Sequence, residues 1–132
     1  MKKIIFTLAF CFFSFVIYSQ NTEKPGWVNR SVFIENGIVY FVGSSSTLSQ
    51  SMALQRAQLN AQSNLFESIL NNVLTEYPTI PVDAKNRSRF SHSYNNVSVN
   101  GTISDITTEG VWVDNNGRTF ALFSCSGIEL AQ

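Results

Sequence analysis

Residues 31–46 read SVFIENGIVYFVGSSS, and this stretch determines much of the expected fold. Alternate residues over 31–35 suit the two faces of a strand. Asn36-Gly37 is the strongest short signal for a hairpin, because both central residues of a type I′ turn need positive φ. The β-branched and aromatic run at 38–42 then predicts the second strand of that hairpin.

A helix is predicted directly after this hairpin. Thr47 with Gln50 fits a capping box, and Ser46 and Ser49 are alternative caps. Gly and Pro are absent from there to about Tyr77, so we expect the helix to continue that far. Its apolar face recurs with a period near 3.6: Ala53, Leu54, Ala57, Ala61, Leu65, Ile69 and Val73. The small alanines would let this helix lie close to a sheet.

A second β region is predicted after a polar connection at 78–94. The first strand of this region begins at residue 97 and continues to 113, with a bulge near 104–105 where the parity of the apolar positions changes. Residues 118–125 form the returning strand of this second hairpin after the turn at 114–117. The predicted fold is therefore α+β, with one long helix packed on a mainly antiparallel sheet in the order ββαββ.

Residues 1–20 have the parts of a cleavable signal peptide. Two lysines supply a positive start, and an apolar run follows over 4–18. This run is shorter than the roughly 20 residues that a membrane span needs. We expect an exported protein cleaved after Ser19 or after Gln20, in which residues 21–132 form a single domain.

The alternatives are a retained N-terminal anchor and lipidation at Cys11. A lipidation signal needs a small residue before the cysteine, where Phe10 stands, and apolar sequence continues to Tyr18. We therefore expect neither. Membrane association remains open, but no transmembrane helix is expected in the mature chain.

Charge and cysteine content narrow the class of partner. Two of the nine Lys and Arg lie in the leader, which leaves seven against nine Asp and Glu and a net charge near −2. Since nucleic-acid-binding domains usually carry a basic face, we expect no nucleic-acid partner. Cys125 is the only cysteine after the leader, which excludes an internal disulfide. We expect it to be buried beside Phe123, with an intermolecular disulfide as the alternative.

Short motifs between residues 25 and 123 combine a Pro-x-Trp start, a strand ending in Gly-Ser, an alanine-rich helix and an Asn-Gly turn. They are Pro25-Gly26-Trp27-Val28, Tyr40-Phe41-Val42-Gly43-Ser44-Ser45, the alanines at 53, 57 and 61, Asp114-Asn115-Asn116-Gly117 and Phe120-Ala121-Leu122. Together they resemble the LPP-twenty family of bacterial envelope lipoproteins. The resemblance implies an envelope location, a dodecin-like α+β fold and no catalytic residues. The lipidated cysteine of that family is missing here, which puts a lipid anchor in doubt.

His92 is the only histidine, and it falls in the predicted polar connection, where a solvated loop residue is expected. It belongs to no recognised catalytic spacing. One histidine and one mature cysteine are too few for a zinc site. We predict no catalytic, cofactor-binding or metal-ligating residue, and no cofactor.

Two surfaces are candidates for binding. Strand alternation places aromatic side chains on the sheet face that a single helix leaves open, and an exposed aromatic face often marks an interaction site. The residues of this predicted surface are Trp27, Tyr40, Trp112 and Phe120. Loops and termini that cover the aromatic face are the alternative. Lys85, Arg87 and Arg89 could contact an anion such as a lipid head group, although a solvated loop is the commoner meaning of such residues.

The predicted function is that of a non-enzymatic envelope protein acting through protein–protein contacts or self-association. It would reside in the periplasm, at the outer membrane or outside the cell. The alternative is an oligomeric carrier that binds a small apolar or aromatic molecule.

Overall fold

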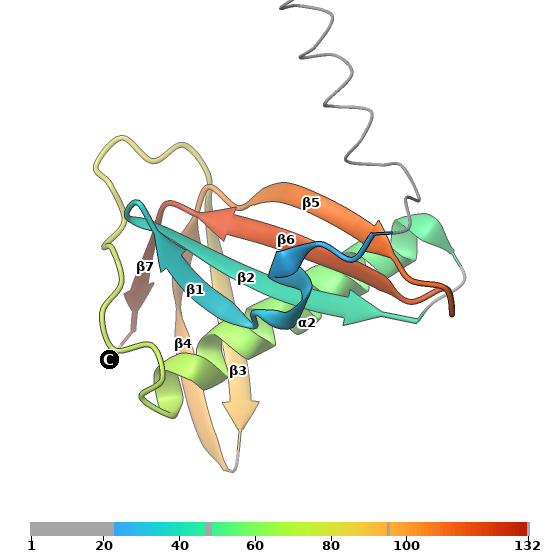
Figure 1. The fold of residues 1–132 in the computed structure, drawn as a ribbon. Coiled ribbons are helices and arrows are strands. Elements are labelled where there is room, and N and C mark those ends of the chain that lie inside the picture. Colours follow the sequence, from blue (N-terminus) through green and yellow to red (C-terminus); the bar gives the residue numbers. More distant parts are fainter. Residues whose placement is uncertain (1–22, 47–48, 95, 132) are drawn as a thin grey trace, which may run out of the picture.

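A computed structural model describes residues 23–46, 49–94 and 96–131 (Figure 1). Within them the fold is α+β, with one α-helix and seven strands in two antiparallel sheets. The elements are η1 (Gly26–Asn29), β1 (Val32–Glu35), β2 (Ile38–Ser45), α2 (Gln50–Leu70), β3 (Arg87–Tyr94), β4 (Val97–Ser104), β5 (Thr107–Val113), β6 (Thr119–Cys125) and β7 (Gly127–Leu130). The described residues contain no helix with the length and hydropathy of a membrane-spanning segment.

Two long, bent strands run through both sheets: β4 continues into β5, and β6 continues into β7. The four-stranded sheet has the order β1-β2-β6-β5, and the three-stranded sheet has the order β3-β4-β7. β5 pairs with β6 through Thr107 opposite Ser124, and β4 pairs with β7 through Ser104 opposite Gly127. Ser104 lies three residues before Thr107, and its partner Gly127 lies three residues after Ser124. The same register therefore continues from one sheet into the other.

The bend between the sheets lies at Asp105 and Ser126. Asp105 has a φ of 52°, and its Oδ1 accepts hydrogen bonds from the N–H groups of Lys85 (3.2 Å) and Asn86 (2.9 Å). The Ser126 hydroxyl donates to Asp105 Oδ2 over 3.1 Å. The Asp105 carboxylate thus connects the residues just before β3 to the bend. The hydrogen bond from the Asn86 N–H is the main cause of the lowered pKa of Asp105.

Three expectations about the chain after α2 change: the strand order, the polar connection at 78–94 and the bulge near 104–105. The strand order is ββαβββββ rather than ββαββ, because the expected polar connection contains β3 and because β7 follows β6. β3 reads RSRFSHSY, which has too little apolar sequence to predict a strand without its partner β4. The parity change at 104–105 marks the bend between sheets, whereas the register shift lies between Thr108 and Gly110.

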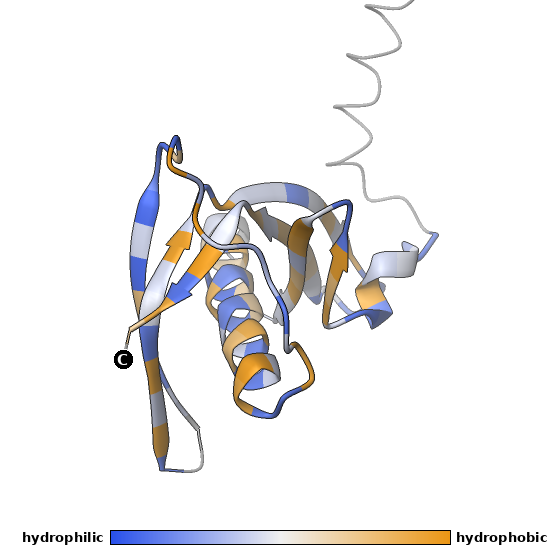
Figure 2. Cartoon of the chain, turned by 90° about the vertical axis from the view of Figure 1, so that its left-hand side faces the viewer, coloured by the Kyte–Doolittle hydropathy of each residue, from blue (hydrophilic) through white to orange (hydrophobic). Residues whose placement is uncertain are grey.

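The first half of α2 packs almost directly on the four-stranded sheet. Ala53, Ala57 and Ala61 are at most 1% exposed, as their spacing predicts. A Cβ added at Gly43 would collide with the backbone of Ala57 and Ala61. Gly43 therefore gives the helix room to approach β2. Figure 2 shows α2 lying between the two sheets.

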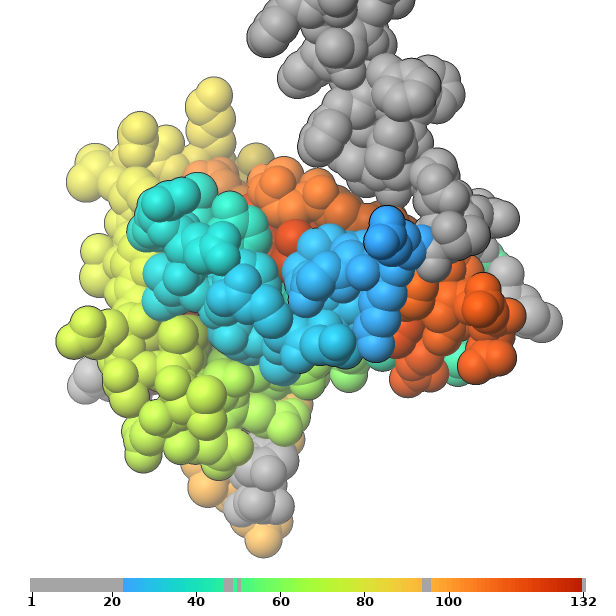
Figure 3. All heavy atoms as spheres, in the orientation of Figure 1, coloured from blue at the N-terminus to red at the C-terminus, as the bar shows by residue number. Residues whose placement is uncertain are grey.

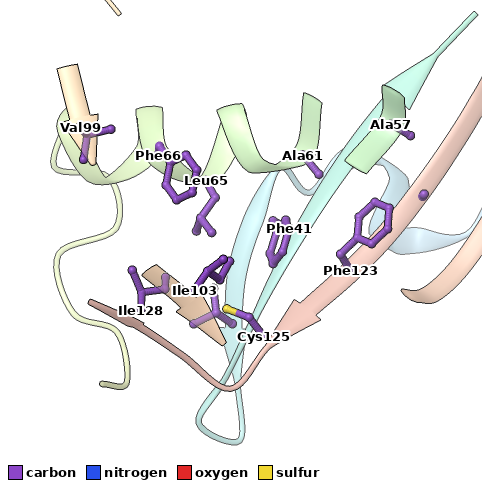
Figure 4. Close-up of a cluster of buried hydrophobic side chains, with 12 residues drawn as sticks. Phe41, Ala57, Ala61, Leu65, Phe66, Val99, Ile103, Phe123, Cys125 and Ile128 are labelled. Carbon is purple, nitrogen blue, oxygen red and sulfur yellow. The ribbon is translucent and has the colours of Figure 1, made fainter. Parts of the chain in front are cut away.

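The second half of α2 fills a wider space with larger side chains. Leu65 and Phe66 are at most 2% exposed, and Phe66 stacks on Phe90 of β3 with ring centroids 3.5 Å apart. Figure 4 shows Leu65 and Phe66 on α2 with Ile103 and Ile128 opposite them. These residues form one core with the alanine-rich half.

The helix is shorter than its sequence suggests. It ends at Leu70 rather than near Tyr77, with Asn71 as the C-cap and Asn72 at a φ of 60°. Asparagine adopts this left-handed conformation more readily than most residues, so it ends the helix. Val73, expected on the apolar face, lies beyond the helix and is 76% exposed. Ser49 is the N-cap; the predicted cap at Thr47 lies outside the described residues.

Candidate interaction surface

The outer face of the four-stranded sheet is the face opposite α2. Since Phe41 and Phe123 point into the core, the alternate residues Tyr40, Leu122 and Phe120 point outward. Trp112 of β5 lies directly opposite Phe120 in the register. The structure therefore brings the sheet members of the predicted aromatic surface to one face.

The aromatic side chains on this face pack in pairs. Phe33 and Tyr40 stack with centroids 5.0 Å apart and planes 14° apart, and Trp112 and Phe120 lie 5.6 Å apart at 38°. The Arg30 guanidinium lies 3.7 Å above the Phe33 ring. These offset and tilted arrangements suit aromatic rings, whose faces and edges carry opposite partial charges.

The N-terminal segment covers part of the outer face. Trp27 of η1 lies over Gly110, where an added Cβ would sit 3.4 Å from the indole ring. Figure 3 shows η1, in blue, resting against the orange strands of this sheet. All four predicted residues are consequently half-buried rather than exposed. We call Trp27, Tyr40, Trp112 and Phe120, together with Phe33, the aromatic face.

The basic residues predicted for anion contact lie on a different face. Arg87 and Arg89 belong to β3 rather than to a loop, on the outer face of the three-stranded sheet, and Lys85 precedes them. Thr102 of β4 pairs with Arg89 of β3 on one side and with Glu129 of β7 on the other. Arg87, Arg89 and Glu129 line a hollow of about 250 Å³. The carboxylate in this hollow opposes the attraction that the two arginines exert on an anion.

His92 is not a solvated loop residue, as its sequence context had suggested. It lies in β3, and its Nε2 is 3.1 Å from Oε2 of Glu67 on α2. Its side chain is 19% exposed. The described residues contain no group of three or more His, Cys, Asp or Glu side chains that could hold a metal ion. The His92–Glu67 pair connects the edge strand to the helix.

Cys125 is buried in the core, 1% exposed. Burial raises the pKa of its thiol to about 12, since the thiolate would lose its hydration. The thiol is therefore neutral near pH 7 and has the character of a small apolar side chain. Cross-linking between chains would require this part of the core to open.

Sequence reasoning missed two asparagines that cover an open strand edge. β1 pairs with β2 only as far as Phe41, and one more backbone bond follows, from the Val42 N–H to the Ser31 carbonyl. Beyond this bond, no strand among the described residues pairs with β2 on that side. Asn64 Nδ2 donates to the Val42 carbonyl (2.9 Å), and Asn60 Oδ1 accepts from the Ser44 N–H (3.0 Å). The four-residue spacing of the two asparagines was the available signal, because it places them on one side of the helix.

In comparisons with known proteins, no family model, curated protein or solved structure matches this chain.

Proposed function

We propose that this protein is a non-enzymatic, exported envelope protein that self-associates through its aromatic face. The observation that supports the proposal most is the gathering of five aromatic side chains opposite α2. Tyrosine and tryptophan contribute large contact areas at low entropic cost and dominate many protein interfaces. A second copy could cover the half-buried rings without any rearrangement of the core.

The envelope location is part of the same proposal. It rests on the signal-peptide pattern of residues 1–20 and on the motifs that resemble the LPP-twenty family. Mass analysis of the exported protein tests it directly. We expect a mature chain that begins at Gln20 or Asn21 and carries no acyl group.

Sedimentation equilibrium of the exported protein tests self-association. We expect Trp112→Ser and Tyr40→Ser to weaken dimerisation about tenfold or more, because each removes an aromatic contact near the centre of the proposed interface. Val82→Ser is the matched control, since Val82 is 99% exposed in a loop outside the aromatic face. Circular dichroism establishes that each variant is folded. A wild-type protein that remains monomeric at millimolar concentration contradicts the proposal.

The alternative role is an oligomeric carrier for a flat apolar or aromatic molecule, in the manner of a dodecin-like assembly. The nearly parallel rings of Phe33 and Tyr40 favour it, because such a pair can extend into a stack with a planar ligand. A light-absorbing small molecule that co-purifies with the wild type and is lost from Tyr40→Ser would support the carrier. It would also assign the aromatic face to ligand binding.

A further inference from the structure

The open edge of β2 meets one side of α2 at regular intervals. Asn64 reaches Val42 and Asn60 reaches Ser44. Four helical residues advance about 6 Å, and two strand residues advance about 6.6 Å, so the two spacings nearly match. One further step along both elements leads to Arg56 and Ser46. An arginine therefore occupies the place where a third asparagine would meet the strand.

A second arginine, Arg118, approaches the same place from the turn before β6. Ser45 pairs with Thr119, and the next step of this register places Arg118 beside Ser46. The backbone N–H of Arg118 donates to Asp114 Oδ1 over 2.8 Å, which holds the turn before β6. Arg56 of α2 and Arg118, the residue before β6, thus lie at the same place.

A hollow of about 410 Å³ lies at this place, and its lining consists of the two arginines, Leu59 and the serines at 44, 45 and 46. No carboxylate lines it, and within the described residues neither guanidinium forms an ion pair. The sequence contains no acidic residue between Glu35 and Glu67, and Arg56 is the one charged residue in that interval. The Asp114 carboxylate, which accepts from the Arg118 backbone N–H, does not line the hollow. The lining of this hollow therefore lacks a carboxylate such as Glu129, which lines the hollow of Arg89.

We propose that this hollow binds a phosphate group carried by a small organic moiety. Guanidinium groups bind phosphate oxygens in pairs of parallel hydrogen bonds, and the hydroxyls of Ser44 and Ser46 can supply further donors. The volume lies within the range of small-molecule sites, about 300–1,000 Å³, which leaves room beyond the phosphate itself. Leu59, 64% exposed at the rim, offers an apolar contact to that remainder. Both a soluble phosphate ester and a phospholipid head group have this chemistry.

Calorimetric titration of the exported protein with glycerol 3-phosphate tests the site. We expect saturable binding that weakens about tenfold in Arg56→Gln and in Arg118→Gln, because each loses charge-assisted hydrogen bonds. Arg87→Gln removes an arginine that is also exposed but shares its hollow with the Glu129 carboxylate, and this variant should bind as the wild type does. Inorganic phosphate should bind more weakly than the ester, since it lacks the organic part.

Vesicles of phosphatidylcholine with one-fifth phosphatidylglycerol distinguish the two sources of phosphate. Vesicle binding that the Arg56→Gln, Arg118→Gln double variant loses identifies a lipid head group. Binding of the soluble ester without vesicle binding identifies a free phosphate ester. No binding of either probe overturns the proposal, and so does an equal loss of affinity in Arg87→Gln, which would indicate nonspecific attraction. Self-association through the aromatic face can fail without affecting any of these results.

Discussion

The two halves of α2 contact their sheets in opposite ways. In the first half, Ala57 and Ala61 place the helix backbone against Gly43, with little side-chain volume between them. In the second half, Leu65 and Phe66 fill a wider gap, which the stack of Phe66 on Phe90 closes. Side-chain size along the helix therefore matches its changing distance from the bent sheet. The protein should tolerate added volume poorly at one end and lost volume poorly at the other.

The largest effect is expected where the gap is widest. Phe66→Ala should lower the free energy of unfolding by about 3–5 kcal/mol, because it leaves a cavity under Phe90 and removes the aromatic stack. Urea denaturation followed by circular dichroism measures this loss. Leu59→Ala, two turns earlier on the same helix, is the control: Leu59 is 64% exposed, so the change should alter stability by less than about 0.5 kcal/mol. Similar losses in both variants would contradict the comparison.

A smaller effect is expected at the narrow end. Gly43→Ala should cost about 1–3 kcal/mol, since the new methyl group meets helix backbone that must move outward. The matched control is Gly26→Ala, where an added Cβ has no neighbour within 4 Å. The same denaturation experiment applies. A Gly43→Ala variant as stable as the wild type would show that the helix is not held at its closest approach.

The smallest effect is expected at Asp105, in the bend between the two sheets that the halves of α2 contact. The pKa of Asp105 is lowered in the folded state, mainly by the hydrogen bond from the Asn86 N–H, so its carboxylate stabilises the fold above the ordinary carboxyl range near pH 4. This contribution is lost as the pH falls through the lowered pKa. Asp105→Asn should therefore reduce stability at pH 7 and flatten its decline below pH 4. Unfolding curves between pH 2 and pH 7 measure both, and an unchanged acid slope would contradict the assignment.

Local patterns predicted the parts of the fold that depend on near neighbours. The Asn36-Gly37 turn forms as expected, with both residues at positive φ. The alanine spacing identified the buried side of α2, and alternation identified the outward direction of Tyr40 and Phe120. These features follow from backbone geometry and from the periods of helix and strand. The role assigned to the aromatic face remains a prediction.

Other features depend on residues that are distant in sequence. β3 has little apolar character, and it becomes a strand because β4 pairs along its whole length and because Phe90 packs on Phe66. His92 is therefore paired with Glu67 instead of being exposed in a loop. The end of α2 at Leu70 was missed because asparagines, rather than Gly or Pro, terminate it.

Sequence alone established the hairpin, the helix face and the two-sided character of the strands, since each follows from residues a few positions apart. The split of one predicted sheet into two, and the approach of Arg56 to Arg118, required the folded chain. Both depend on the bend at Asp105 and on the register between β2 and β6, which join residues 19 or more positions apart. Such contacts form only when the whole core packs, so no local pattern records them.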